Sequence, residues 1–332
     1  MPFQILALSG GGYRGLFSAH ILSKLEEQAG RPIGECFDLI AGTSIGGIIA
    51  IGLALGKPAR EIRDVFEQKG EDIFTRGEPT WNPVTNSWRF LRGIVKPRYD
   101  GTELRKAIDA VVGADTSIGD AKTRLLVPTV NMTKGSVQLF KTAHHPSFIN
   151  DYKVKATDVA MATSAAPTFF PMAKIGASYF VDGGVVANAP DLCATHEATH
   201  FLGIEISDIR VLSIGTITTG FSLPTSLGGN FGASSWMKNQ RLISMIFSSQ
   251  QQLVDVMVRH RLGDRYLRMD DKPGQEQSSD LGLDIASKNR RETLLGMADG
   301  VHQRFGGSAE IRAMLDHQPI RPIFYKDRKP LP

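Results

Sequence analysis

Ser44 occupies the centre of Gly42-Thr43-Ser44-Ile45-Gly46, a G-x-S-x-G pentapeptide that lies between two apolar runs. The run before it, 37–41, has the length of a buried strand, and the run after it, 47–55, is long enough to form a helix. A serine on a sharp turn between strand and helix exposes its hydroxyl at the edge of a sheet. This setting predicts that Ser44 is a nucleophile and that Gly42 and Gly46 support the turn.

The other apolar runs predict the sheet to which this turn belongs. Short runs typical of buried strands lie at 3–8, 37–41, 125–130, 137–141, 179–181, 201–206 and 211–214. Apolar residues recur at helical spacing over 16–28, 236–260, 285–305 and 309–315. This alternation favours an α/β fold with a mostly parallel sheet covered on both faces. Functional sites of such sheets lie beyond the carboxyl ends of the strands, where the Ser44 turn falls.

The composition is that of a globular protein, and it narrows the choice of partners. Of the 332 residues 42% are hydrophobic, and the formal net charge is +4. This small excess does not indicate a nucleic-acid polymer, and it favours an anionic membrane surface or a small anionic ligand. Two cysteines and no recognisable signal peptide predict a cytoplasmic protein. Because no apolar run approaches the ~18 residues of a membrane span, action on a lipid would be peripheral.

A serine nucleophile needs a base, and the base predicted here is Asp182. No histidine lies near a turn directly after the last expected sheet strand, where a catalytic triad would place it. Asp182 directly follows the apolar run 179–181, and Gly183 and Gly184 allow a tight turn after it. A carboxylate can act as a base when it contacts the hydroxyl and its pKa is raised by burial.

The loop after the first expected strand predicts an oxyanion hole. Gly10, Gly11 and Gly12 have no Cβ atoms, so several amides can approach one developing negative charge. Arg14 follows at the start of the next helix and could add positive charge there. The same glycines also match a dinucleotide-binding fingerprint, but no acidic residue ends the second strand, since Asp38 lies inside it.

A second pattern offers an alternative chemistry. His196-Glu197-Ala198-Thr199-His200 matches H-E-x-x-H, the zinc-binding helix of metallopeptidases. The extended form of that motif would place its third ligand at position 206, which is Ile206 and cannot bind zinc. A zinc metallopeptidase that uses His196, Glu197 and His200 is therefore the alternative to the serine enzyme.

Several stretches together resemble the patatin-like phospholipases. They are 9–15, 42–47, 96–100, 162–167, 182–184, 185–190 and 212–216. The resemblance covers roughly residues 3–216 and implies a three-layer α/β/α fold with a Ser44–Asp182 dyad. It also implies hydrolysis of acyl esters in membrane phospholipids, of phospholipase A or lysophospholipase type, without a metal or cofactor. We expect a catalytic domain at 1–216 and a largely helical C-terminal extension at 217–332 that packs on it.

The chain length and the extension are also similar to the bacterial CapV-type members of this family. That similarity implies activation by a cyclic dinucleotide in anti-phage defence, and action at the inner face of the cell membrane. A basic pocket would then bind the nucleotide. Two clusters qualify as candidates: Arg89, Arg92, Lys96 and Arg98, and Arg259, Arg261, Arg265 and Arg268. Homo-oligomerisation stays open.

Two further segments allow more than one interpretation. The aromatic and basic segment 75–98 is either a membrane-docking element or an ordinary packed connection. The helix expected over 236–260 covers the sheet, docks on a membrane or packs in a dimer, and the first of these is favoured. The pair His144-His145 is expected in a solvated loop.

Overall fold

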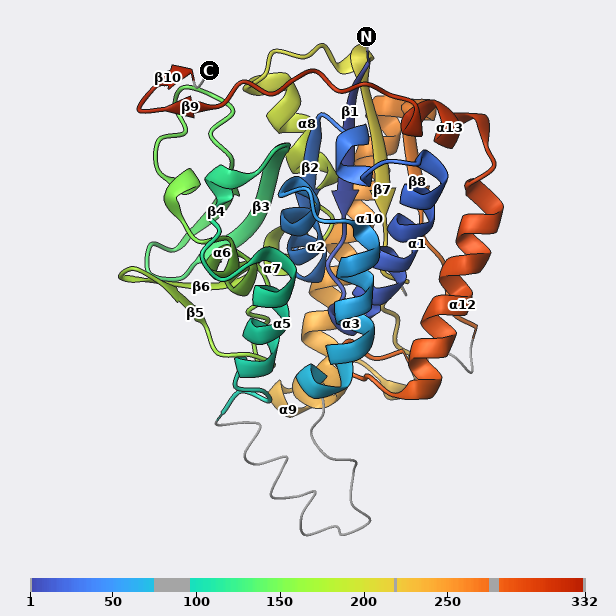
Figure 1. Cartoon of the computed structure of the whole chain (residues 1–332). Helices are drawn as coiled ribbons and strands as arrows, with labels where there is room; N and C mark the ends of the chain where they lie inside the picture. Colours follow the sequence, from blue (N-terminus) through green and yellow to red (C-terminus); the bar gives the residue numbers. More distant parts are fainter. Residues whose placement is uncertain (1, 75–95, 218–219, 275–280, 331–332) are drawn as a thin grey trace.

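A central sheet between two layers of helices forms the body of the molecule (Figure 1). The computed structural model describes residues 2–74, 96–217, 220–274 and 281–330. Within these ranges no helix combines the length and the apolar character that crossing a membrane requires. The sheet with a helical layer on each face confirms the three-layer α/β/α architecture expected from the sequence.

The sheet is mostly parallel. Its eight strands are β1 (Phe3–Leu8), β2 (Leu39–Gly42), β3 (Arg124–Asn131), β4 (Ser136–Lys141), β5 (Ala173–Ile175), β6 (Ser178–Asp182), β7 (Ile209–Ile214) and β8 (Tyr266–Met269). The order is β5-β6-β3-β2-β1-β7-β8, with β4 paired to β3. The strands β3, β2, β1, β7 and β8 run parallel, whereas β4, β5 and β6 form antiparallel pairs at one side. A separate hairpin joins β9 (Tyr325–Lys326) and β10 (Lys329–Pro330).

Helices cover both faces of this sheet. The helices of the described residues are α1 (Gly15–Ala29), α2 (Ile45–Ala54), α3 (Ala59–Phe74), α5 (Thr102–Val112), α6 (Ala156–Thr163), α7 (Gly184–Ala187), α8 (Asp191–His200), α9 (Ala233–Met237), α10 (Arg241–Leu262), α12 (Lys288–Phe305) and α13 (Ala309–Leu315). Side chains of β1 alternate between the two faces, as the pleat of a strand requires. Leu6 and Leu8 pack with α1 and α2, whereas Ile5 and Ala7 pack with α8 and α10.

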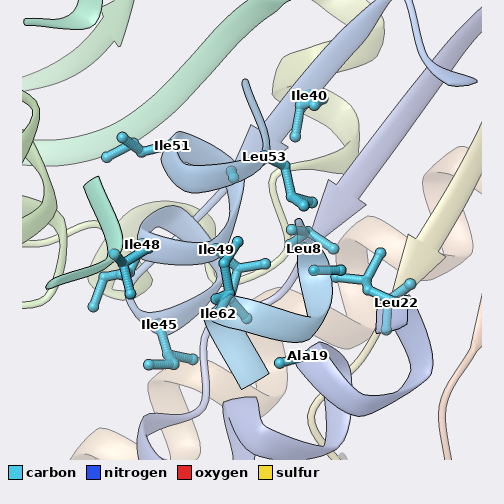
Figure 2. Packing of buried hydrophobic residues seen from close by; sticks show 14 of the residues in the cluster. Leu8, Ala19, Leu22, Ile40, Ile45, Ile48, Ile49, Ile51, Leu53 and Ile62 are labelled. Carbon is cyan, nitrogen blue, oxygen red and sulfur yellow. The ribbon is translucent and has the colours of Figure 1, made fainter. Parts of the chain in front are cut away.

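The larger core lies between the sheet and the layer that contains α1, α2 and α3. Figure 2 shows Ile48 and Ile49 of α2 among side chains of neighbouring elements, including Leu22 and Ile62. All four of these side chains are almost completely buried. α2 is apolar around its whole circumference, which fits a helix buried on every side. The serine turn is therefore fixed at the N-terminus of the most deeply packed helix.

One predicted strand is absent from the structure, and the sequence did not predict β5 and β8 of the central sheet. The run 201–206 is not a strand: it follows α8, which ends at His200, and its last residue begins the 3-10 turn Ile206–Asp208. Its apolar side chains Leu202, Ile204 and Ile206 pack on a second, smaller core on the other face of the sheet, which includes Ile5, Ala7, Ala194 and Val258. The apolar pattern of the run reflects this packing, without strand pairing. Conversely, β8 was missed because Arg268 interrupts its apolar pattern. The ion pair with Asp270, at 2.8 Å, allows this arginine to be buried in the sheet.

The C-terminal extension is largely helical, as expected, and it also adds β8 to the edge of the sheet next to β7. The helix expected over 236–260 is α10, which packs Val258 and Leu262 into the second core. Its inner face therefore covers the sheet. The membrane-docking interpretation of 75–98 falls mostly on residues 75–95, which lie outside the described ranges, as do Arg89 and Arg92.

Candidate active site

Ser44 adopts a backbone conformation that few residues other than glycine tolerate. Its φ is 56° and its ψ is −127°, at the junction between β2 and α2. The Ser44 N–H donates to Thr163 Oγ1 at 3.0 Å, and the Thr163 hydroxyl donates to the Pro128 carbonyl at 2.7 Å. Hydrogen bonds from β3 and α6 thus hold the strained serine turn in place.

Gly42 and Gly46 support the turn through close backbone approach, as the sequence predicts. A Cβ atom on Gly42 would overlap the carbonyl oxygen of Gly46. A Cβ atom on Gly46 would overlap the carbonyl oxygen of Leu8, at the end of β1. Since backbone atoms cannot move aside as a flexible side chain does, both positions require glycine.

The base predicted from the sequence lies beside the serine. The Ser44 hydroxyl donates to Asp182 Oδ2 at 2.7 Å, and the Gly184 N–H donates to Asp182 Oδ1 at 2.7 Å. Asp182 is completely buried, and this burial raises its pKa to about 7, although the bonds from Gly184 and Ser44 oppose the increase. Such a carboxylate can both hold and release a proton near neutral pH. Gly183 fits because a Cβ atom there would overlap the Pro128 carbonyl oxygen.

The glycine loop after β1 lies against the serine, but one of its amides is already used. The Gly10 N–H donates to the Asn188 carbonyl at 2.9 Å, so the prediction that Gly10 supplies an oxyanion donor does not match this geometry. Gly10 instead allows its loop to approach Ser44 closely, because a Cβ atom on Gly10 would lie only 3.1 Å from Ser44 Cβ. Within the described ranges the N–H groups of Gly11 and Gly12 have no protein acceptor. These two amides remain as candidate oxyanion donors.

Arg14 stabilises the loop rather than the site itself. Its Nε donates to the Gly11 carbonyl at 3.4 Å, and a terminal nitrogen donates to the Ile217 carbonyl at 3.1 Å. Burial lowers the pKa of the guanidinium to about 10, with Asp270 opposing the decrease. Because the guanidinium binds two carbonyl oxygens, Arg14 fixes the loop to the segment after β7.

An apolar pocket opens beside the serine. Ser44 and Asp182 form part of its polar wall, and its lining residues are Gly12, Ser44, Ile45, Ile48, Phe74, Leu104, Ser164, Ala166, Phe169, Phe170, Asp182, Phe247 and Leu283. Such a lining suits a hydrocarbon chain whose ester reaches the serine. Phe247 and Leu283 come from the C-terminal extension, and sequence reasoning missed both because no local motif marks them.

Leu283 also contacts the glycine loop directly. Its carbonyl accepts the Tyr13 N–H at 2.9 Å and lies where a Cβ atom on Gly12 would stand. The next residue, Asp284, forms an ion pair with Arg98 and accepts the Tyr99 hydroxyl at 3.0 Å. The extension is thus anchored at the mouth of the cavity.

The arginines of the second candidate cluster for nucleotide binding make other contacts in the structure. Arg268 is buried in its ion pair with Asp270 and donates to Ser213 at 2.7 Å. Arg265 donates to the carbonyls of Ile206 and Ile209, the first residues of the 3-10 turn before β7 and of β7 itself. Arg259 pairs with Asp255 at 3.0 Å on α10. Arg259, Arg265 and Arg268 are thus each held by other protein groups, and Arg261 is exposed.

The zinc-helix alternative is not supported by the geometry. Glu197 is buried, and it pairs with Lys141 at 2.5 Å and with His144 at 3.0 Å. His196 and His200 are exposed and stack on each other with ring centroids 5.1 Å apart. Among the described residues no three histidine, cysteine or acidic side chains gather as a metal site would need. The expectation that His144 is solvated is wrong, because Glu197 holds it inside.

Fold and site define a three-layer α/β/α protein with a strained serine turn at the end of a parallel strand and a buried carboxylate beside it. Residues 6–191 match the family of patatin-like phospholipases. A cGAMP-activated phospholipase of Pseudomonas aeruginosa is 40% identical over 331 residues, which cover 97% of this chain and 95% of the relative. One of the same description from Vibrio cholerae is 40% identical over 314 residues, 88% of each chain. The chain belongs to the patatin-like phospholipase family.

Solved structures align less closely. Human GIVD cytosolic phospholipase A2 aligns at 10% identity with a TM-score of 0.44, over 95% of this chain and 60% of that chain. At this TM-score the alignment says nothing about the site.

Proposed function

We propose that this protein hydrolyses acyl esters of membrane phospholipids with a Ser44–Asp182 dyad. The observation that carries the proposal is the 2.7 Å hydrogen bond between the Ser44 hydroxyl and Asp182 Oδ2. The carboxylate is buried, and its pKa is raised to about 7, so it can take the hydroxyl proton without a histidine. The apolar cavity beside the dyad suits a fatty acyl chain.

The reaction follows from these positions. Asp182 accepts the proton of Ser44 while Oγ attacks the ester carbonyl, and the N–H groups of Gly11 and Gly12 bind the resulting oxyanion. Collapse of the tetrahedral intermediate breaks the ester bond, and the leaving alkoxide takes the proton from Asp182. Water then attacks the acyl-enzyme with Asp182 as base, which releases the fatty acid and restores Ser44. We assign no metal or cofactor to these steps.

The regulation proposed here rests on the relatives. The proteins from Pseudomonas aeruginosa and Vibrio cholerae are described as cGAMP-activated phospholipases, and their alignments include most of the extension. We therefore propose that a cyclic dinucleotide also activates this chain, as part of anti-phage defence at the inner face of the membrane. In this proposal residues 1–216 form the catalytic domain and residues 217–332 form the extension that controls it.

Product analysis tests this proposal. The purified protein is incubated with vesicles of phosphatidylethanolamine and phosphatidylglycerol, with and without cGAMP, and lipids are identified by mass spectrometry. We expect free fatty acid and lysophospholipid with cGAMP and little without it. The same vesicles containing lysophospholipid distinguish a phospholipase A from a lysophospholipase. Absence of fatty acid under every condition would contradict the proposed reaction, and equal release without cGAMP would contradict only the regulation.

A further inference from the structure

We infer that Gln250 and Gln251 of α10 are positioning residues for the proposed reaction, and that they hold the oxyanion loop through Asn188. The inference rests on the proposed Ser44–Asp182 chemistry. α10 belongs to the C-terminal extension and lies beyond residues 6–191, which match the family. Its glutamines therefore add a part to the site that the family motifs do not contain.

The 184–188 turn, which comprises α7 and its C-cap Asn188, connects three parts of the site. Its Gly184 N–H donates to Asp182 Oδ1 at 2.7 Å. Its Ala187 carbonyl accepts the Thr43 hydroxyl at 2.6 Å, next to the nucleophile. Its Asn188 carbonyl accepts the Gly10 N–H at 2.9 Å. A displacement of this turn would thus move the base, the serine turn and the oxyanion loop together.

α10 holds the 184–188 turn from outside the catalytic domain. The side-chain amide of Asn188 donates to Gln251 Oε1 at 3.1 Å, and the Asn188 N–H donates to Gln250 Oε1 at 3.4 Å. The side-chain amide of Gln250 donates in return to the Val185 carbonyl. One helix therefore makes three hydrogen bonds to the 184–188 turn, one at Val185 and two at Asn188.

The packing around these bonds limits how the turn can relax without them. Gln251 is 4% exposed and Asn188 is 3% exposed, so water cannot simply replace the glutamine oxygen. Asn188 Oδ1 is buried without a partner among the described residues, and it lies beside Gly10, where a Cβ atom would meet it at 2.5 Å. One turn earlier on α10, the Phe247 ring packs against Gly184. Loss of the Gln251 oxygen would free the Asn188 side chain next to the oxyanion loop.

The test compares variants on α10 by steady-state kinetics with p-nitrophenyl butyrate and cGAMP present. Gln251→Met keeps the side-chain length but removes the acceptor, and Gln251→Glu keeps an acceptor for Asn188. We expect Gln251→Met to lower kcat about tenfold with KM unchanged, because displaced donors weaken transition-state binding. Gln251→Glu should keep most of the wild-type kcat. Gln252→Met is the matched control, since Gln252 is exposed and bonds to Ser248 on its own helix.

Hydrogen exchange gives a readout that does not depend on turnover. In Gln251→Met, amides in a peptide covering residues 3–15 should exchange faster than in Gln252→Met, because the Asn188–Gly10 bond is weakened. Gln250→Met, at a half-buried position, tests the same link if Gln251→Met does not fold. Wild-type kcat and unchanged exchange in both Gln250→Met and Gln251→Met would overturn the inference. Wild-type inactivity, or turnover retained in Ser44→Ala, would instead overturn the proposed function.

Discussion

Ser44 and Asp182 are in direct contact: the serine hydroxyl donates to Asp182 Oδ2 at 2.7 Å. The two residues are 138 positions apart in the sequence. Ser44 lies just beyond β2, which is parallel to β3, whereas Asp182 is the last residue of β6, which is antiparallel to β3 and pairs Asp182 with Thr129. The register of β6 on β3, near the carboxyl end of β3, thus brings the base to the nucleophile. Burial of Asp182 then gives a carboxylate the basicity that a triad obtains from histidine.

The pH dependence of activity should report the ionisation of Asp182. Its pKa is raised to about 7, and only the ionised form can accept the Ser44 proton. We expect kcat/KM for a soluble ester to fall tenfold per pH unit below a midpoint near 7. The profile should be measured across about pH 5–9. A profile that stays flat down to about pH 5 would exclude Asp182 as the titrating base.

Asp182 should also destabilise the fold above neutral pH. An unfolded aspartate has a pKa of ~3.9, so between this value and about 7 only the folded state keeps the proton, and stability falls as pH rises. The full decline corresponds to about 4 kcal/mol. Asp182→Asn should remove this decline and raise the free energy of unfolding at pH ~8. Urea denaturation at two pH values checks it, and an equal pH dependence in both proteins would contradict the assignment.

The serine turn should not tolerate a methyl group at Gly46. Its Cβ would overlap the carbonyl oxygens of Leu8 and Ser9, so Gly46→Ala should lower the free energy of unfolding by at least ~2 kcal/mol. Gly296→Ala is the matched control, because Gly296 lies exposed in α12 with no atom near its Cβ. That variant should gain up to ~1 kcal/mol. Similar unfolding midpoints for both variants would show that the turn can relax.

The buried pair of Glu197 and Lys141 should be structural. Glu197→Ala leaves the Lys141 ammonium unpaired at a site where its side chain is 10% exposed, so the unfolding free energy should fall by ~3–5 kcal/mol. Asp115→Ala removes the exposed pair with Lys155 and should cost under ~1 kcal/mol. Thermal unfolding measures both. Loss of activity in Glu197→Ala without loss of stability would revive a catalytic role for this helix.

The local pattern of apolar runs and glycine motifs predicted much of the fold and both residues of the dyad. The apolar run 3–8 is β1, and the motifs around Ser44 and Asp182 lie at the strand ends where alternation placed them. Contacts between distant segments were not predictable in this way. The use of the Gly10 amide depends on Asn188, and the burial of Arg268 in β8 depends on Asp270. The cavity residues Phe247 and Leu283 likewise reach the site only through the packing of the extension.

The most direct test of the Ser44–Asp182 assignment is the rate of covalent labelling by a fluorophosphonate, measured by intact-protein and peptide mass spectrometry. A single adduct should form on the peptide that contains Ser44 and be absent from Ser44→Ala. Asp182→Asn should slow labelling at least ~100-fold, because the hydroxyl then lacks its base. An adduct on another residue, or labelling of Asp182→Asn at the wild-type rate, would contradict the assignment.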